Sequence, residues 1–227
     1  MTLRCRCLSA TYDPELDEQF VMDGATLTEH ADSCAAIVLA DGKEARAHAL
    51  LDAGARRVLI GEAALIDGVI IERLAERHGK QRVGLYVPVS RLAVDWSFET
   101  VSNADFKLVT PSICEPTWEI LRADGSGTGT HADWWIGQML ARGTQMVLLR
   151  ADIKDDTDLN LCAGLVEKLG DQLWITPPPN TTPPLSEWIE FGKVGQLALP
   201  PDLYQRRGEW PCLATLKSAD EALMEAS

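Results

Sequence analysis

Residues 52–61 read DAGARRVLIG, and the chain repeats the pattern of this stretch at 77–87, 141–150 and 168–178. In each copy an amphipathic stretch ends in glycine, and an apolar run begins a few residues later. Glycine ends a helix at low cost because it adopts left-handed backbone angles that other residues avoid. The apolar runs do not alternate with polar residues, which is typical of parallel strands buried on both faces. The repeat therefore predicts helices that alternate with the strands of a parallel sheet.

The spacing of these strands predicts what connects them. In each copy, an apolar strand residue follows the glycine by four positions. These residues are Val58, Val83, Val147 and Trp174, and the intervals between them are 25, 64 and 27 residues. A βα unit occupies about 25 to 30 residues, so the first and last intervals have room for one helix each. The middle interval has room for one unit plus an insertion. We place this insertion at about 88–128 and expect one or two hairpins that end in a Gly/Thr loop.

Eight strands in all are expected, and their number decides the fold class. We place them at residues 3–9, 19–24, 35–41, 56–63, 82–89, 145–152, 172–178 and 195–201. Eight strands with mostly helical connections indicate a single (β/α)8 barrel domain over 1–227. The first two connections are too short for regular helices, so the N-terminal third is compressed. An open doubly wound sheet is the main alternative, and it is disfavoured because no glycine-rich dinucleotide loop follows any strand.

Charge and composition exclude several classes of partner. The formal net charge is −13, which disfavours nucleic acid and anionic membranes as partners. No apolar run reaches the roughly 18 residues that a membrane span needs, and we expect a cytoplasmic protein. The six cysteines form no CxxC pair, and the four histidines show no metal-ligand spacing. We therefore expect free, mostly buried thiols and neither a metal nor a cofactor.

Several stretches are similar to one known family. Three of them are FVMDGA at residues 20–25, ALLDAGARRVLIGEAA at 49–64 and VLLRADIKDD at 147–156. The fourth is 118–134, which begins with WEI, continues through a Gly/Thr stretch and ends with DW. In these stretches the chain resembles the histidine-biosynthesis barrel family (HisA/HisF-like). That family comprises phosphoribosylformimino-aminoimidazole carboxamide ribotide isomerase and the cyclase subunit of imidazole glycerol phosphate synthase. The resemblance implies a barrel of the ribulose-phosphate-binding type.

The chain departs from the family at the positions that carry its chemistry. The family uses two acid/base carboxylates, at the ends of the first and fifth strands, where this chain has Ser9 and Pro88. It also binds phosphate on glycine-rich turns, whereas prolines at 177–179 and 200–201 follow the seventh and eighth strands here. Proline has no N–H to donate to a phosphate. These departures predict that the family reaction is changed or lost on a retained scaffold.

Candidate site residues lie at the carboxyl ends of the strands, where barrel enzymes carry out their chemistry. The acid/base candidates are Asp156, which matches the family's sixth-strand acid, together with Asp23 and Glu62. The substrate-binding candidates are Gly61, Ala63, Asp41, Gly127, Thr128 and His131. The alternative interpretation is that these carboxylates cap helices or face water, and Asp41 stands where it would cap the next helix.

Two classes of function remain open. The first is an isomerase- or cyclase-like enzyme that acts on or binds a small metabolite, phosphorylated or not, such as an aminoaldose or sugar phosphate. Its pathway is related to histidine biosynthesis, or is another one such as synthesis of a pterin- or furan-type one-carbon cofactor. The second is a non-catalytic binding or partner subunit, since the family cyclase works beside a glutaminase subunit. Trp134 and Trp135 are adjacent on a predicted helix, so exposure of one of them would suit a subunit interface.

Overall fold

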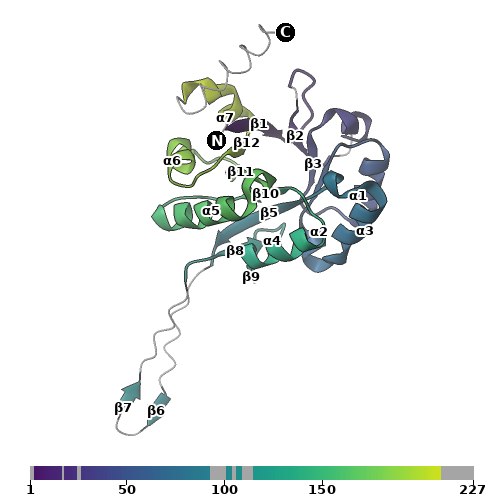
Figure 1. Ribbon diagram of the computed structural model, residues 1–227. Helices are drawn as coiled ribbons and strands as arrows, with labels where there is room; N and C mark the ends of the chain where they lie inside the picture. The colour runs from purple at the N-terminus through teal and green to yellow at the C-terminus, as the bar shows by residue number, and fades with distance from the viewer. Residues whose placement is uncertain are drawn as a thin grey trace.

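The computed structural model describes residues 3–16, 18–24, 27–92, 101–103, 106–108 and 115–210, and its centre is a closed barrel of eight parallel strands (Figure 1). In barrel order the strands are β1 (Arg4–Ser9), β2 (Phe20–Met22), β3 (Ala36–Leu39), β4 (Val58–Ile60), β5 (Val83–Arg91), β10 (Val147–Arg150), β11 (Leu173–Thr176) and β12 (Gln196–Leu199). Parallel pairing of β12 with β1 closes the ring. Each strand coincides with a predicted one, so the (β/α)8 barrel is confirmed.

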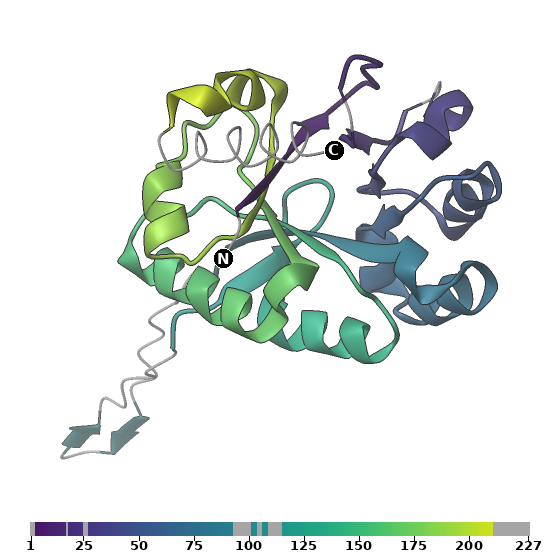
Figure 2. The same cartoon turned by 45° about the horizontal axis from the view of Figure 1, so that its top comes forward.

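The helices lie on the outside of this ring, as Figures 1 and 2 show for α4 and α5 beside β5 and β10. The α-helices are α1 (Glu44–Asp52), α2 (Glu62–Ile66), α3 (Val69–His78), α4 (Ala132–Ala141), α5 (Asp156–Leu169), α6 (Leu185–Glu190) and α7 (Pro201–Gln205). The 3-10 helices are η1 (Leu27–Ser33), η2 (Lys80–Arg82), η3 (Gly170–Gln172) and η4 (Arg206–Glu209). The compressed N-terminal third is confirmed: in its described part, no helix connects β1 to β2 and only η1 connects β2 to β3. The interval before β5 holds the short α2 as well as α3, one helix more than predicted.

Two antiparallel strand pairs follow the fifth barrel strand, as predicted. They are β6 (Val101–Asn103) with β7 (Phe106–Leu108), and β8 (Trp118–Leu121) with β9 (Gly127–His131). The end of β5 also pairs with β8, which ties the second hairpin to the barrel. Residues 93–100 of the predicted insertion lie outside the described residues.

The predicted Gly/Thr loop at 123–130 is confirmed only in its first half, because residues 127–131 form strand β9 of a hairpin. The Thr128 hydroxyl donates to the Ile120 carbonyl at 2.7 Å, and the Glu119 carboxylate accepts from the Gly129 N–H at 2.9 Å. The turn of this hairpin comes earlier, where the Arg122 N–H donates to the Ser126 carbonyl. Cross-strand pairing with β8 therefore overrides the low strand propensity of glycine.

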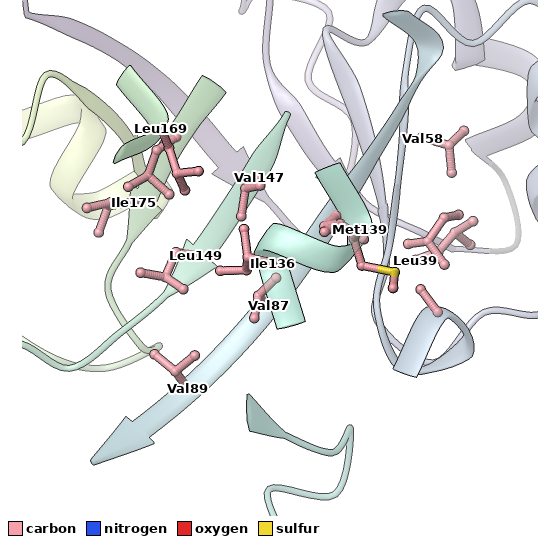
Figure 3. Close-up of a cluster of buried hydrophobic side chains, with 14 of the residues drawn as sticks. Leu39, Val58, Val87, Val89, Ile136, Met139, Val147, Leu149, Leu169 and Ile175 are labelled. Carbon is pink, nitrogen blue, oxygen red and sulfur yellow. The ribbon is translucent and has the colours of Figure 1, made fainter. Parts of the chain in front are cut away.

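Side chains of the barrel strands form two layers of core. Successive residues of a strand point to opposite sides, so one set fills the barrel and the other packs beneath the helices. Figure 3 shows the outer layer, in which Ile136 of α4 lies against Val87 and Leu149. All three are almost fully buried. Each such side chain contributes roughly 1.5 to 3 kcal/mol through removal from water, so the outer layer holds α4 firmly over β5 and β10.

Helices α1 and α3 are joined by a pair of histidines. His48 Nδ1 and His78 Nε2 lie 2.8 Å apart, so one ring donates a hydrogen bond to the other. The His78 side chain is only 5 % exposed, and burial lowers its pKa below the ordinary value. Two carboxylates flank the pair, Glu44 at 3.7 Å from His48 and Asp52 at 3.8 Å from His78. The contact needs at least one neutral ring.

We predict that this histidine pair makes the stability of the protein fall in mild acid. Because the pKa of His78 is lower in the folded chain, the unfolded chain binds more protons below about pH 6.5. The free energy of unfolding is therefore highest above that pH and falls as the pH decreases, by at most about 1.4 kcal/mol per pH unit for one proton. Urea denaturation between pH 5 and 7.5 measures this slope. The variant His78→Gln should flatten it, whereas the exposed His131→Gln should not; equal slopes in the wild type and His78→Gln would contradict the assignment.

Candidate functional site

The mouth of the barrel, at the carboxyl ends of the strands, contains a small inner pocket of about 60 Å³. Strands β2 to β5 and β10, helices α2 and α4 and the β8–β9 hairpin all contribute to it. Its lining residues are Met22, Ala40, Gly61, Glu62, Leu65, Tyr86, Pro88, Ile120, Leu121, Ala123, Trp135 and Arg150. A pocket of this size accepts one small polar or anionic group of a ligand.

Arg150 is the cation of the inner pocket. It is the last residue of β10 and pairs in register with Pro88 of β5 and Thr176 of β11. Its guanidinium carbon lies 5.7 Å from the ring centroid of Tyr86, and burial raises the pKa of that phenol. Among the residues that the structure describes, Arg150 has neither an ion-pair partner nor a hydrogen-bond partner. Its five N–H donors are therefore free to bind an anion.

Glu62 is the carboxylate of the inner pocket, and it is one of the predicted acid/base residues. It begins α2 directly after Gly61, whose N–H donates to the Leu39 carbonyl at 2.8 Å. One Glu62 oxygen accepts from the Ala123 N–H at 3.1 Å, and the Arg122 guanidinium lies 3.9 Å from the other. Gly61 and Glu62 thus lie in the mouth, as predicted. Ala63 packs partly against the outer core and lines no pocket described here.

A wider outer pocket of about 530 Å³ adjoins the inner one and shares Leu121 and Arg150 with it. It is lined by Val89, Ser90, Arg91, Trp118, Leu121, Arg150, Asp152, Lys154, Asp155, Asp158, Pro178 and Pro179. Unlike Arg150, the other two cations of this pocket are paired. The Lys154 ammonium lies 2.8 Å from Asp152. Arg91 forms ion pairs with Asp155, the N-cap residue of α5, and with Asp158 of the same helix.

The Arg91 network forms the wall of the outer pocket. Asp155 caps α5 by accepting from two backbone N–H groups, and its hydrogen bond to Arg91 lowers its pKa to about 2. Asp158 is buried, with a side chain only 4 % exposed. It accepts from Arg91 Nε at 3.1 Å and from the Trp118 indole N–H at 3.0 Å. Its second oxygen accepts from the Lys154 backbone N–H at 3.1 Å. This carboxylate therefore joins β5, β8 and the β10–α5 loop.

None of the other predicted carboxylates lines the inner or the outer pocket. Asp156 is exposed at the first position of α5 and lines neither mouth pocket. Asp23 binds Arg46 of α1, with the closest contact at 2.7 Å, and so fixes the end of β2 to a helix. Asp41 is exposed and does not cap α1, because Lys43 occupies the N-cap position without a side-chain cap.

The residues predicted around the Gly/Thr stretch lie to one side of the mouth. Gly127 is exposed on β9, and the Thr128 hydroxyl is used within the hairpin. His131 precedes α4 and lines a separate groove of about 630 Å³ between the start of α4 and α5. None of these three residues lines the inner or the outer pocket.

The two strand ends that carry the acids in the resembled family carry none here. Ser9 is buried and its hydroxyl donates to the Thr11 carbonyl at 2.7 Å, while Pro88 lines the inner pocket. The described cysteines are free, and burial raises the pKa of each thiol to about 11 or 12; they are Cys5, Cys7, Cys34 and Cys162. A thiol with such a pKa carries no thiolate nucleophile at neutral pH. The other two cysteines lie outside the described residues.

Sequence reasoning missed the side chains with the most open binding capacity, Arg150 and Tyr86. A signal for Arg150 exists in the alternation of β10, since Met146 and Leu148 belong to the inner core and the next residue in phase is Arg150. The same alternation in β5 puts Tyr86 and Pro88 on the inner side. Neither residue is a carboxylate, so a pattern of paired acids does not indicate them.

Three further features of the chain concern membranes, metal ions and known families. Within the described part of the chain, no helix has the length and apolar character needed to cross a membrane. No cluster of three or more metal-ligating side chains occurs among the same residues. No model of a known protein family matches the chain.

Proposed function

We propose that the chain binds a small anionic metabolite in the mouth of its barrel, with Arg150 as the anion-binding residue. The observation that carries this proposal is the unpaired guanidinium of Arg150 at the junction of the inner and outer pockets. A charged group in a partly enclosed site without a counter-ion is unfavourable unless a ligand or water satisfies it. Barrel proteins bind their substrates at this end of the strands.

The reaction proposed for this site belongs to the isomerase and cyclase chemistry of a divergent HisA/HisF-like barrel. Glu62 is the carboxylate of the inner pocket and supplies the acid/base group, and the Tyr86 phenol is the second group able to exchange a proton. The family reaction itself is not proposed, because Ser9 and Pro88 replace both of its carboxylates. The proposed substrate is therefore a small metabolite, phosphorylated or not, outside the step that the family catalyses.

A thermal-shift assay with the wild type and Arg150→Met tests this proposal. The panel contains the bis-phosphorylated aminoimidazole carboxamide ribotide, inorganic phosphate, sugar phosphates, aminocarboxylates and uncharged ribose. A ligand at about 100 times its Kd adds roughly 2.7 kcal/mol to stability, which raises Tm by about 5 to 10 °C in a chain of this size. We expect at least one anionic ligand to produce such a shift in the wild type and none in Arg150→Met.

The matched control is Arg77→Met, which removes an exposed arginine of α3 that lines neither mouth pocket and contacts none of their carboxylates. Its ligand-induced shift should equal that of the wild type. Shifts that persist in Arg150→Met, or no shift with any anion, would exclude Arg150 as the anion-binding residue.

A non-catalytic partner subunit is the second candidate, and one observation favours it. Trp134 of α4 is 59 % exposed, whereas its neighbour Trp135 is buried. A large exposed aromatic side chain is common at protein interfaces. Analytical ultracentrifugation of the wild type and Trp134→Gln tests self-association through this surface. An assembly that Trp134→Gln dissociates supports a subunit role, and a monomer in both excludes self-association through Trp134.

A further inference from the structure

We infer that the ligand of the barrel mouth is an aminocarboxylate, held by its carboxylate on Arg150 and by its amine on Glu62. This inference rests on the proposed function and specifies the chemistry of its ligand. It is carried by three features of the two mouth pockets: their charge, their supply of N–H donors and the position of Glu62.

The charge of the mouth favours a singly charged anionic group over a phosphate. The charged residues that line the two pockets are Arg91, Arg150, Lys154, Glu62, Asp152, Asp155 and Asp158. Three cations thus face four carboxylates, and two of the cations are already paired with aspartates. A dianionic phosphate would meet one free guanidinium and a surplus of negative charge. A carboxylate carries half that charge and matches the two parallel N–H groups of one arginine.

In the described part of the mouth, the loops after β11 and β12 begin with residues that lack the donors used by phosphate sites. Phosphate is held where several backbone N–H groups converge, as in glycine-rich turns at helix N-termini. The β11 strand is followed by Pro177, Pro178 and Pro179, and the last two line the outer pocket. Pro200 and Pro201 follow β12. Proline has no N–H, so these residues donate nothing to a phosphate.

Glu62 completes the match to an aminocarboxylate. It lines the inner pocket together with Arg150. Among the described residues, its polar partners are the Ala123 N–H and, at 3.9 Å, the guanidinium of Arg122. An ionised carboxylate has about four acceptor positions, so most of them stay open to a ligand. An ammonium group is the ligand group that satisfies them with opposite charge. Glu62 in the inner pocket and Arg150 at the junction with the outer pocket therefore present one anion and one cation, which together are the complement of a zwitterion.

Two fragments of equal chain length test the inference. They are 4-aminobutyrate and 3-aminopropylphosphonate, which differ in the anionic group alone, and butyrate serves as the analogue without the amine. Binding is measured by saturation-transfer NMR at pH 8, where the phosphonate is a dianion, with the wild type, Arg150→Met and Glu62→Gln. We expect 4-aminobutyrate to bind the wild type at least about tenfold more tightly than either other fragment, a ratio that corresponds to about 1.4 kcal/mol.

The variants separate failure of the inference from failure of the proposed function. Arg150→Met should remove binding of 4-aminobutyrate, and Glu62→Gln should reduce its advantage over butyrate. Tighter, Arg150-dependent binding of the phosphonate would overturn the aminocarboxylate inference and leave the proposed anion site intact. An advantage over butyrate that Glu62→Gln leaves unchanged would overturn the role of Glu62. Binding of every fragment that is unaffected by Arg150→Met, or absent at millimolar concentration, would overturn both proposals.

Discussion

Replacing Asp158 with alanine should lower the free energy of unfolding by about 2 to 6 kcal/mol, because two N–H groups lose their acceptor at about 1 to 3 kcal/mol each. The Asp158 side chain is 4 % exposed and accepts from Arg91, the Trp118 indole and the Lys154 backbone. The variant leaves the Trp118 and Lys154 N–H groups without an acceptor. Urea denaturation at pH 7.5 measures the loss.

The neighbouring Asp155 supplies the matched control, because it binds the same arginine from the same helix. Its side chain is 51 % exposed, so water replaces the lost contacts when it is removed. Asp155→Ala should therefore cost clearly less than Asp158→Ala, although it also removes the N-cap of α5. Equal losses in the two variants would show that burial of Asp158 does not determine its contribution.

The same pair of variants links stability to the mouth. Arg91 and Trp118 line the outer pocket, and Asp158 holds both of them. Its loss should loosen the wall of that pocket as well as the fold. Asp158 is therefore a positioning residue for the proposed site, in which Arg150 is the proposed ligand contact.

The barrel could be predicted because its signal is repeated and local. A glycine turn followed by an apolar run marks β4, β5, β10 and β11. Four further apolar runs bring the number of strands to the eight that a closed barrel needs. The strand β9 could not be predicted in this way. Its residues have low strand propensity, and the contact that makes them a strand is with β8.

The candidate site was predicted only in part, because a sequence pattern does not tell which of several neighbouring side chains faces the mouth. Asp155, Asp156 and Asp158 follow the same strand, yet one caps the helix, one is exposed and one is buried. Family resemblance pointed to Asp156. Their different roles follow from where α5 begins and from which aspartates Arg91 binds.

Glycine 61 is the predicted site residue with the largest expected effect on both fold and mouth. A Cβ atom at Gly61 would lie 2.3 Å from the Ala40 carbonyl oxygen and 3.0 Å from the Leu39 carbonyl oxygen. Both contacts are with backbone, which has no side-chain rotamer to relieve them. Gly61→Ala must therefore separate the ends of β3 and β4, where the N–H groups of Gly61 and Glu62 bind those carbonyls at 2.8 Å. We expect a loss of about 2 to 3 kcal/mol, or about 5 to 10 °C in Tm.

A second glycine in the same fold shows whether the clash, and not the added methyl group, causes this loss. Gly137 lies within α4, and a Cβ there would meet nothing within 4 Å. Gly137→Ala should raise stability by roughly 0.5 to 1 kcal/mol, because alanine favours the helix. Gly61→Ala should in addition weaken the Arg150-dependent ligand shift, since Ala40 and Gly61 both line the inner pocket. A Gly61→Ala protein with the Tm of the wild type would show that the ends of β3 and β4 can separate without loss of stability. An unchanged ligand shift would show that the inner pocket does not depend on their close approach.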